Sequence, residues 1–148
     1  MMIDSILSKA KEVMKQAHAD QTRWDGRPYS VHPEKVVSIL KLLEIDDEET
    51  LAVAYLHDVL EDTEYTEEKM RFDFGDYITD QVKQLTFKDS KNDDEIYYEQ
   101  CRKLSNLVKP IKIADILANI TDDGKKSDHF IRKRIEALKI LVDNTPQQ

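Results

Sequence analysis

The chain has 148 residues, of which 40% are hydrophobic and 35% charged, and this composition excludes a disordered segment. Its formal net charge of −8 excludes the basic surface that nucleic-acid binding requires, although a metal and a few basic side chains can still bind a small phosphorylated ligand. No stretch approaches the roughly 20 apolar residues of a membrane span, so we expect neither nucleic acid nor a membrane as a partner.

The first half of the chain predicts three helices. Apolar residues recur at spacings of three and four over residues 3–17, with Asp4 or Ser5 as N-cap, and a polar loop follows over residues 20–29. A second helix is expected over residues 33–44, because Pro33 suits a first helical turn. The third helix, residues 51–60, is apolar almost all round and should therefore be central.

The second half continues the helical pattern. A short helix over residues 66–72 is expected to end at Gly75, and another follows over residues 76–85. Residues 88–94 read as an exposed loop that could gate a pocket. Helices are then predicted over residues 95–107, 110–120 and 129–142. With only 3 Gly and 4 Pro, the chain is expected to form one all-α helical domain over residues 1–148.

The end of the third predicted helix carries an unusual set of acids. Asp58, Glu61 and Asp62 lie where the helix dipole disfavours carboxylates, and helical spacing places Glu61 one turn beyond His57. A bound divalent cation would resolve this conflict. The alternative is a solvated helix end with a surface histidine, although the apolar residues around the pair favour burial.

A second polar stripe interrupts the apolar helix predicted over residues 110–120. Lys112, Asp115 and Asn119 are spaced three and four residues apart. A buried carboxylate needs a partner, which is either a metal, with Asn119 left to orient a ligand, or Lys112 in an intrahelical pair facing solvent.

His32, at the start of the second predicted helix, completes a candidate metal site with His57, Asp58 and Asp115. On its own it could equally be a capping or exposed histidine. Two imidazoles and two carboxylates suit one Mn²⁺ or Fe²⁺ ion, with Co²⁺, Ni²⁺ or Zn²⁺ as substitutes, and four ligands leave open positions for water and substrate.

Four sequence blocks in order resemble the HD-domain phosphohydrolases, specifically the hydrolase domain of the RelA/SpoT type. They are AHADQTRWDGRPYSVHP (residues 17–33), HDVLEDT (57–63), FGDYITDQVKQLT (74–86) and KIADILANI (112–120). The resemblance covers residues 3–121. It implies an all-α HD-domain fold and hydrolysis of (p)ppGpp to GDP or GTP and pyrophosphate.

The same resemblance implies roles for individual residues. His32, His57, Asp58 and Asp115 would bind Mn²⁺, Glu61 and Asp62 would position or deprotonate the attacking water, and Arg23 and Asn119 would contact the substrate. The alternative for Arg23 is a salt bridge with Asp25. His18 is expected to brace the helix or loop, and Trp24 either packs locally or lines the pocket rim.

Two positions depart from the family pattern and keep other functions open. Ile116 and Thr121 stand where the family usually has basic residues. An alternative is therefore an HD-type phosphatase acting on another nucleotide, such as a deoxynucleoside monophosphate or NADPH. A further alternative is a catalytically silent module that binds a nucleotide or a partner.

The cysteine content bears on localisation. Cys101 is the only cysteine, so an intrachain disulfide is impossible, and residues 1–10 lack the apolar core of a secretory signal. We expect a cytoplasmic protein, and the sequence leaves its oligomeric state open.

Overall fold

The structure is a computed structural model that describes residues 5–143, and these residues form eight α-helices. The fold is all-α, as predicted, and within the described range an isolated bridge between Thr22 and Pro28 is the only β pairing. The helices are α1 (Ile6–Ala17), α2 (Val31–Leu42), α3 (Glu48–Leu56), α4 (Val59–Asp62), α5 (Glu67–Gln84), α6 (Asp94–Lys103), α7 (Lys109–Ile120) and α8 (Asp128–Val142).

The first helix begins with a local capping interaction. The backbone N–H of Ser8 donates to the hydroxyl of Ser5 over 3.0 Å, which makes Ser5 the N-cap of α1 and satisfies one free donor of the first turn. Ile3 and Asp4, which the sequence also assigned to this helix and its cap, lie outside the described residues.

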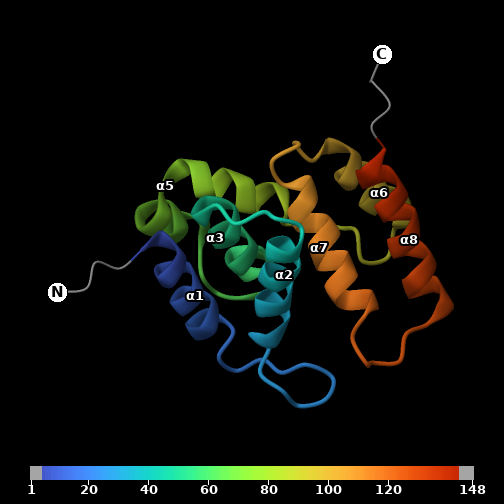
Figure 1. Cartoon of the computed structure of the whole chain (residues 1–148), viewed down its shortest axis with the longest axis horizontal. Helices are drawn as coiled ribbons and strands as arrows, with labels where there is room; N and C mark the ends of the chain where they lie inside the picture. Colours follow the sequence, from blue (N-terminus) through green and yellow to red (C-terminus); the bar gives the residue numbers. More distant parts are fainter. Residues whose placement is uncertain (1–4, 144–148) are drawn as a thin grey trace.

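Helix α3 is the centre of the first half of the molecule, as its apolar sequence predicts. All residues from 51 to 56 are buried, and α3 packs against α1, α2 and α5 (Figure 1). Burial on every side explains why α3 lacks the polar stripe of a surface helix. Its C-terminal end is therefore fixed inside the domain, where His57 and Asp58 follow.

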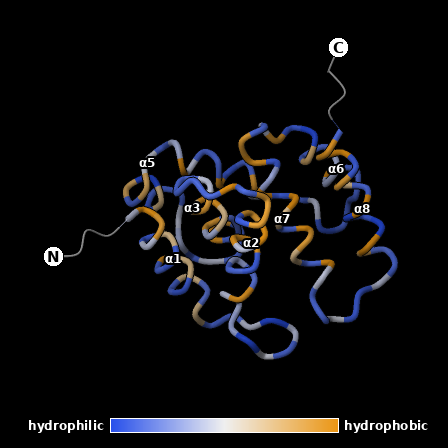
Figure 2. The backbone as a smooth tube through the Cα atoms, in the orientation of Figure 1, coloured by the Kyte–Doolittle hydropathy of each residue, from blue (hydrophilic) through white to orange (hydrophobic). Residues whose placement is uncertain are grey.

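The second half of the fold is built on α7. This helix packs against α2 on one side and α8 on the other, and α8 in turn packs against α6 (Figure 1). Figure 2 shows apolar and polar segments alternating along the helices, as amphipathic packing requires. The contact between α2 and α7 brings His32 and Asp115 to the same place.

Two predicted helix boundaries need correction, and a third prediction is confirmed. The helix predicted over residues 51–60 is interrupted, since α3 ends at Leu56 and α4 starts at Val59. The helix predicted over residues 95–107 ends at Lys103, because the backbone of Leu104 is extended and its side chain packs into the core. The break predicted at Gly75 is confirmed, because the backbone of Gly75 is non-helical and divides α5, residues 67–84, into two helical segments.

None of the helices in the described part of the chain is long and apolar enough to cross a membrane.

Candidate metal centre and active site

Both candidate histidine ligands are buried, so neither is a surface residue. His32 is 4% exposed near the start of α2, and His57 is 3% exposed as the C-cap of α3. The Nδ1 atom of His57 lies 2.6 Å from the carbonyl oxygen of Ala54. Because a carbonyl can only accept, Nδ1 carries the proton and the lone pair of Nε2 is free to bind a ligand.

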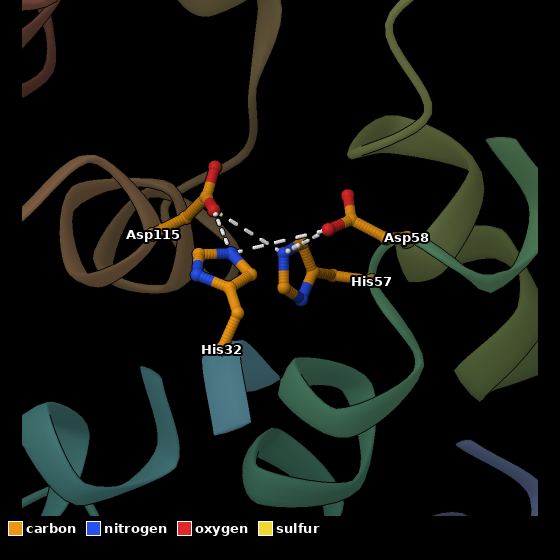
Figure 3. Close-up of side chains that lie close together, drawn as sticks. All are labelled: His32, His57, Asp58 and Asp115. Atoms are coloured by element: carbon orange, nitrogen blue, oxygen red, sulfur yellow. Dashed lines mark hydrogen bonds and ion pairs between the residues drawn. The ribbon is translucent and has the colours of Figure 1, made fainter. Parts of the chain in front are cut away.

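The two candidate carboxylates face these imidazoles from separate elements (Figure 3). Asp58 lies between α3 and α4, and its Oδ2 is 3.0 Å from Nε2 of His57 and 3.9 Å from Nε2 of His32. Asp115 comes from α7, and its Oδ1 is 2.8 Å from Nε2 of His32 and 3.3 Å from Nε2 of His57. We call these four residues the His–Asp cluster.

The His–Asp cluster has the composition and spacing of a cation site. One ligand atom from each of the four residues lies within 4.8 Å of the other three. Nε2 of His57 is buried, yet it has no hydrogen-bond partner among the described residues despite its short distances to two carboxylate oxygens. A divalent cation would satisfy this nitrogen and both carboxylates together.

Lys112 supplies part of the compensating charge. Its Nζ lies 3.2 Å from Oδ2 of Asp115, so the intrahelical pair considered from the sequence does form, but both side chains are largely buried and do not face solvent. Burial alone would raise the pKa of Asp115, but the charge of Lys112, followed by the contacts of its carboxylate with the imidazoles of His32 and His57, holds that pKa well below its usual value. Asp115 is therefore ionised, with Oδ1 directed at the cluster.

A cavity of about 490 Å³ opens beside the cluster and contains Glu61 and Asp62. Carboxylate oxygens of Asp58, Glu61 and Asp62 lie within 4.8 Å of one another. Glu61 remains accessible to solvent, but the loss of water around its carboxyl, followed by the charges of Asp58 and Asp62, raises its pKa to about 7. The backbone N–H of Phe87 donates to Oε1 of Glu61 over 2.7 Å and fixes its orientation.

Arg23 and Asn119 contact each other at the edge of the same cavity. One guanidinium nitrogen of Arg23 lies 3.3 Å from Oδ1 of Asn119 and 3.1 Å from Oδ2 of Asp122. The alternative pairing with Asp25 is wrong, because Asp25 pairs with Arg27 over 2.5 Å. Both predicted substrate contacts therefore line the cavity together.

The sequence did not assign several residues that line this cavity. Tyr29 donates its hydroxyl hydrogen to Oδ2 of Asp58, and its position three residues before His32 was the one signal for it. The loop before α6 and helix α8 add basic side chains far from the cluster in sequence, for which no local pattern exists: Lys91, Lys133 and Arg134.

Comparison with known proteins identifies the family. The model of the family described as "HD domain" matches residues 10–137 of the chain. The chain belongs to the HD domain family.

Relatives with curated names match most of the chain. A guanosine-3′,5′-bis(diphosphate) 3′-pyrophosphohydrolase of Haemophilus influenzae is 40% identical over 86% of the chain, and a GTP pyrophosphokinase of Streptomyces coelicolor is 38% identical over 92%. The chain spans 20% and 17% of the lengths of these two relatives, respectively.

A solved structure matches over nearly its whole length. It is described as "a metazoan ortholog of SpoT" that "hydrolyzes ppGpp and plays a role in starvation responses". It superposes with a TM-score of 0.84 at 26% identity, and the match covers 96% of this chain and 88% of the other. This HD-domain fold therefore forms within a chain of similar size.

Proposed function

We propose that this chain is a metal-dependent phosphohydrolase that removes the 3′-pyrophosphate of (p)ppGpp and releases GDP or GTP. The observation that carries the proposal is a single cavity in which the His–Asp cluster, two further acids and several basic side chains meet. Support comes from the solved relative described as hydrolysing ppGpp, because that protein is of similar length and shares the fold.

We propose Mn²⁺ as the ion held by the His–Asp cluster, with Fe²⁺, Co²⁺, Ni²⁺ or Zn²⁺ as substitutes. Neutral imidazole nitrogens and carboxylate oxygens are ligands that such ions accept. The ion would acidify a bound water and polarise a phosphoryl oxygen. His57 could bind this ion through Nε2, because the hydrogen bond from its Nδ1 to the carbonyl of Ala54 fixes its tautomer.

The other residues that line the cavity would activate the water or bind the substrate, according to their positions. Glu61, oriented by the N–H of Phe87, would accept a proton from the attacking water, and Asp62 would help to position that water. Arg23 and Asn119 would hold the substrate. Lys91 and Lys133, which also line the cavity, would offset the charge of the pyrophosphate group.

Ile116 and Thr121, the two departures from the family pattern, differ in whether they can contact a substrate. Ile116 is 1% exposed and packs in the core, so an apolar residue there does not change the lining of the cavity. Thr121 is exposed at the end of α7, in a small adjoining cavity that Arg23 also lines. Thr121 is therefore the departure that can influence which nucleotide is bound.

Product analysis tests the proposal. The protein is incubated with Mn²⁺ and, in separate reactions, ppGpp, a deoxynucleoside monophosphate and NADPH, and the products are separated by ion-exchange chromatography. We expect GDP and pyrophosphate from ppGpp. Turnover confined to either of the other substrates would favour the alternative nucleotide phosphatase. Absence of turnover with all three, from protein that binds Mn²⁺, would contradict the hydrolase assignment.

A pair of variants locates the reaction in this cavity. Glu61→Gln should reduce kcat by about 10²- to 10⁴-fold, the usual contribution of a positioned acid or base, while Mn²⁺ still binds. Glu64→Gln is the matched control, because Glu64 is an exposed acid three residues further along the chain and outside this cavity. Equal activity of the two variants would exclude Glu61 from the reaction.

A further inference from the structure

The loop between α1 and α2 reaches the metal centre through Tyr29. Its hydroxyl donates to Oδ2 of Asp58, which is also the oxygen nearest to Nε2 of His57. Tyr29 therefore acts on the oxygen of Asp58 that faces the two imidazoles. Because a donated hydrogen bond fixes a carboxylate in one rotation, the phenol limits how Asp58 can turn.

The same loop also contacts Asp62, through Gln21. The side-chain Nε2 of Gln21 donates to the backbone carbonyl oxygen of Asp62 over 2.8 Å. The backbone N–H of Tyr29 donates to the carbonyl oxygen of Gln21 over 3.0 Å. Gln21 and Tyr29 are thus joined to each other, and each one contacts a different acid of the site.

His18 contacts both Gln21 and Tyr29. It is 3% exposed, its Nδ1 lies 2.8 Å from Oε1 of Gln21, and its ring centroid is 4.4 Å from that of Tyr29. The carbonyl of Asp62 fixes the amide nitrogen of Gln21, so Oε1 must face His18 and accept from Nδ1–H. One imidazole therefore orients the amide and packs against the phenol.

We propose that Tyr29 and Gln21, held by His18, are positioning residues with separate tasks: Tyr29 orients Asp58 for the metal, and Gln21 holds Asp62 for the water. The inference rests on the metal site of the proposed function. It predicts a division that a general loss of stability would not produce. Tyr29 controls metal affinity, whereas Gln21 controls turnover once the metal is bound.

The first test is the dissociation constant of Mn²⁺ alone, measured by isothermal titration calorimetry on the full chain. Tyr29→Phe removes only the hydroxyl, and we expect the Kd to rise about 10- to 100-fold, as is typical for outer-sphere partners of metal ligands. Tyr65→Phe is the matched control. It removes an equivalent tyrosine–aspartate bond, from Tyr65 to Asp73 at 2.5 Å, away from the cluster, and should leave the Kd within twofold.

The second test separates turnover from binding. Gln21→Met keeps the length of the side chain but removes its amide. We expect kcat at saturating Mn²⁺ to fall about 10- to 100-fold, with the Mn²⁺ Kd within twofold of wild type. The melting temperature of each metal-free variant, by circular dichroism, should fall no further than that of Tyr65→Phe.

The outcomes separate this inference from the proposed function. If wild-type protein binds no Mn²⁺, the metal site and the inference are both overturned. If wild type binds Mn²⁺ and Tyr29→Phe binds it equally tightly, only the inference is overturned. It is also overturned if both variants lose metal affinity and metal-free stability together, because that result indicates a merely structural loop.

Discussion

Asp115 shows how one side chain can take part in two interactions that the sequence presents as alternatives. Its Oδ2 pairs with Lys112, whereas its Oδ1 faces His32 and His57. From spacing alone, a lysine three residues before an aspartate suggests a surface ion pair, and this pair stands as an alternative to a metal ligand. A carboxylate has two oxygens, so both interactions coexist, and burial converts an ordinary pair into part of the site.

Removal of Lys112 tests this view of Asp115. Lys112→Met leaves a buried carboxylate without its cation, so the free energy of unfolding of the metal-free protein should fall by about 3–5 kcal/mol. Urea denaturation measures the change. Lys139→Met is the control, because Lys139 forms a pair of the same spacing with Glu136 on an exposed face and should cost less than about 1 kcal/mol. Similar small losses in both variants would contradict the buried pair.

At the scale of secondary structure, the break after α3 matters most for the site. The sequence predicts one helix over residues 51–60, because neither glycine nor proline marks an interruption. The structure ends α3 at Leu56, where the side chain of His57 donates to the carbonyl of Ala54. That break depends on tertiary contacts, such as the bond from Tyr29 to Asp58, which no local pattern contains. The acidic residues after α3 could be predicted from the sequence, but the tertiary hydrogen bonds that hold them in place could not.

The N-cap of α3 gives a prediction with a defined pH dependence. Asp47 accepts hydrogen bonds from the hydroxyl of Thr50 at 2.6 Å and its N–H at 3.1 Å, and these bonds, the hydroxyl's above all, lower the pKa of Asp47. Since the folded-state pKa is depressed, the stabilisation is present above the unfolded-state pKa of about 3.9 and is lost as pH falls.

Asp47→Ala should therefore destabilise the protein by about 1 kcal/mol at neutral pH, and the difference from wild type should shrink as pH falls below about 4. Urea denaturation across this pH range measures it. A difference that stays constant with pH would show that the charge of Asp47 is not involved.

The kink in α5 depends on Gly75. Its backbone has φ 84° and ψ 173°, a conformation that residues with a Cβ rarely adopt, although an added Cβ would meet no atom within 4 Å. Gly75→Ala should therefore cost about 1–3 kcal/mol through backbone strain alone. Glu68→Ala, in the same helix at an exposed position, should change stability by no more than about 0.5 kcal/mol. Equal stabilities in urea would show that the kink tolerates a side chain.

At the scale of the whole molecule, the fold brings together residues that are far apart in the chain. His32 and Asp115 are 83 residues apart, and they meet because α2 packs against α7. The resemblance to an ordered set of motifs made this meeting predictable, whereas helical periodicity could not. The basic side chains Lys91 and Lys133 belong to no such motif, so only the packing of α8 on α7, and of α6 on α8, reveals their place.

A cation that links α2, α7 and the α3–α4 junction should stabilise the folded protein as a whole. At Mn²⁺ concentrations 100 times the Kd, the added free energy is about 2.7 kcal/mol if the unfolded chain does not bind. For a chain of this size that corresponds to a rise in Tm of about 5–10 °C. Thermal unfolding with Mn²⁺ and with EDTA measures it, and unchanged Tm values would contradict a metal that bridges these helices.

The most direct test of the central claim is the stoichiometry of Mn²⁺ binding to wild type and to two histidine variants, measured by calorimetry. We expect one Mn²⁺ per chain in wild type, none in His57→Ala, and one in His129→Ala, because the His129 side chain is 71% exposed and pairs only with Asp94 among the described residues. Undiminished binding by His57→Ala, or no binding by wild type, would contradict a metal centre built on His32, His57, Asp58 and Asp115.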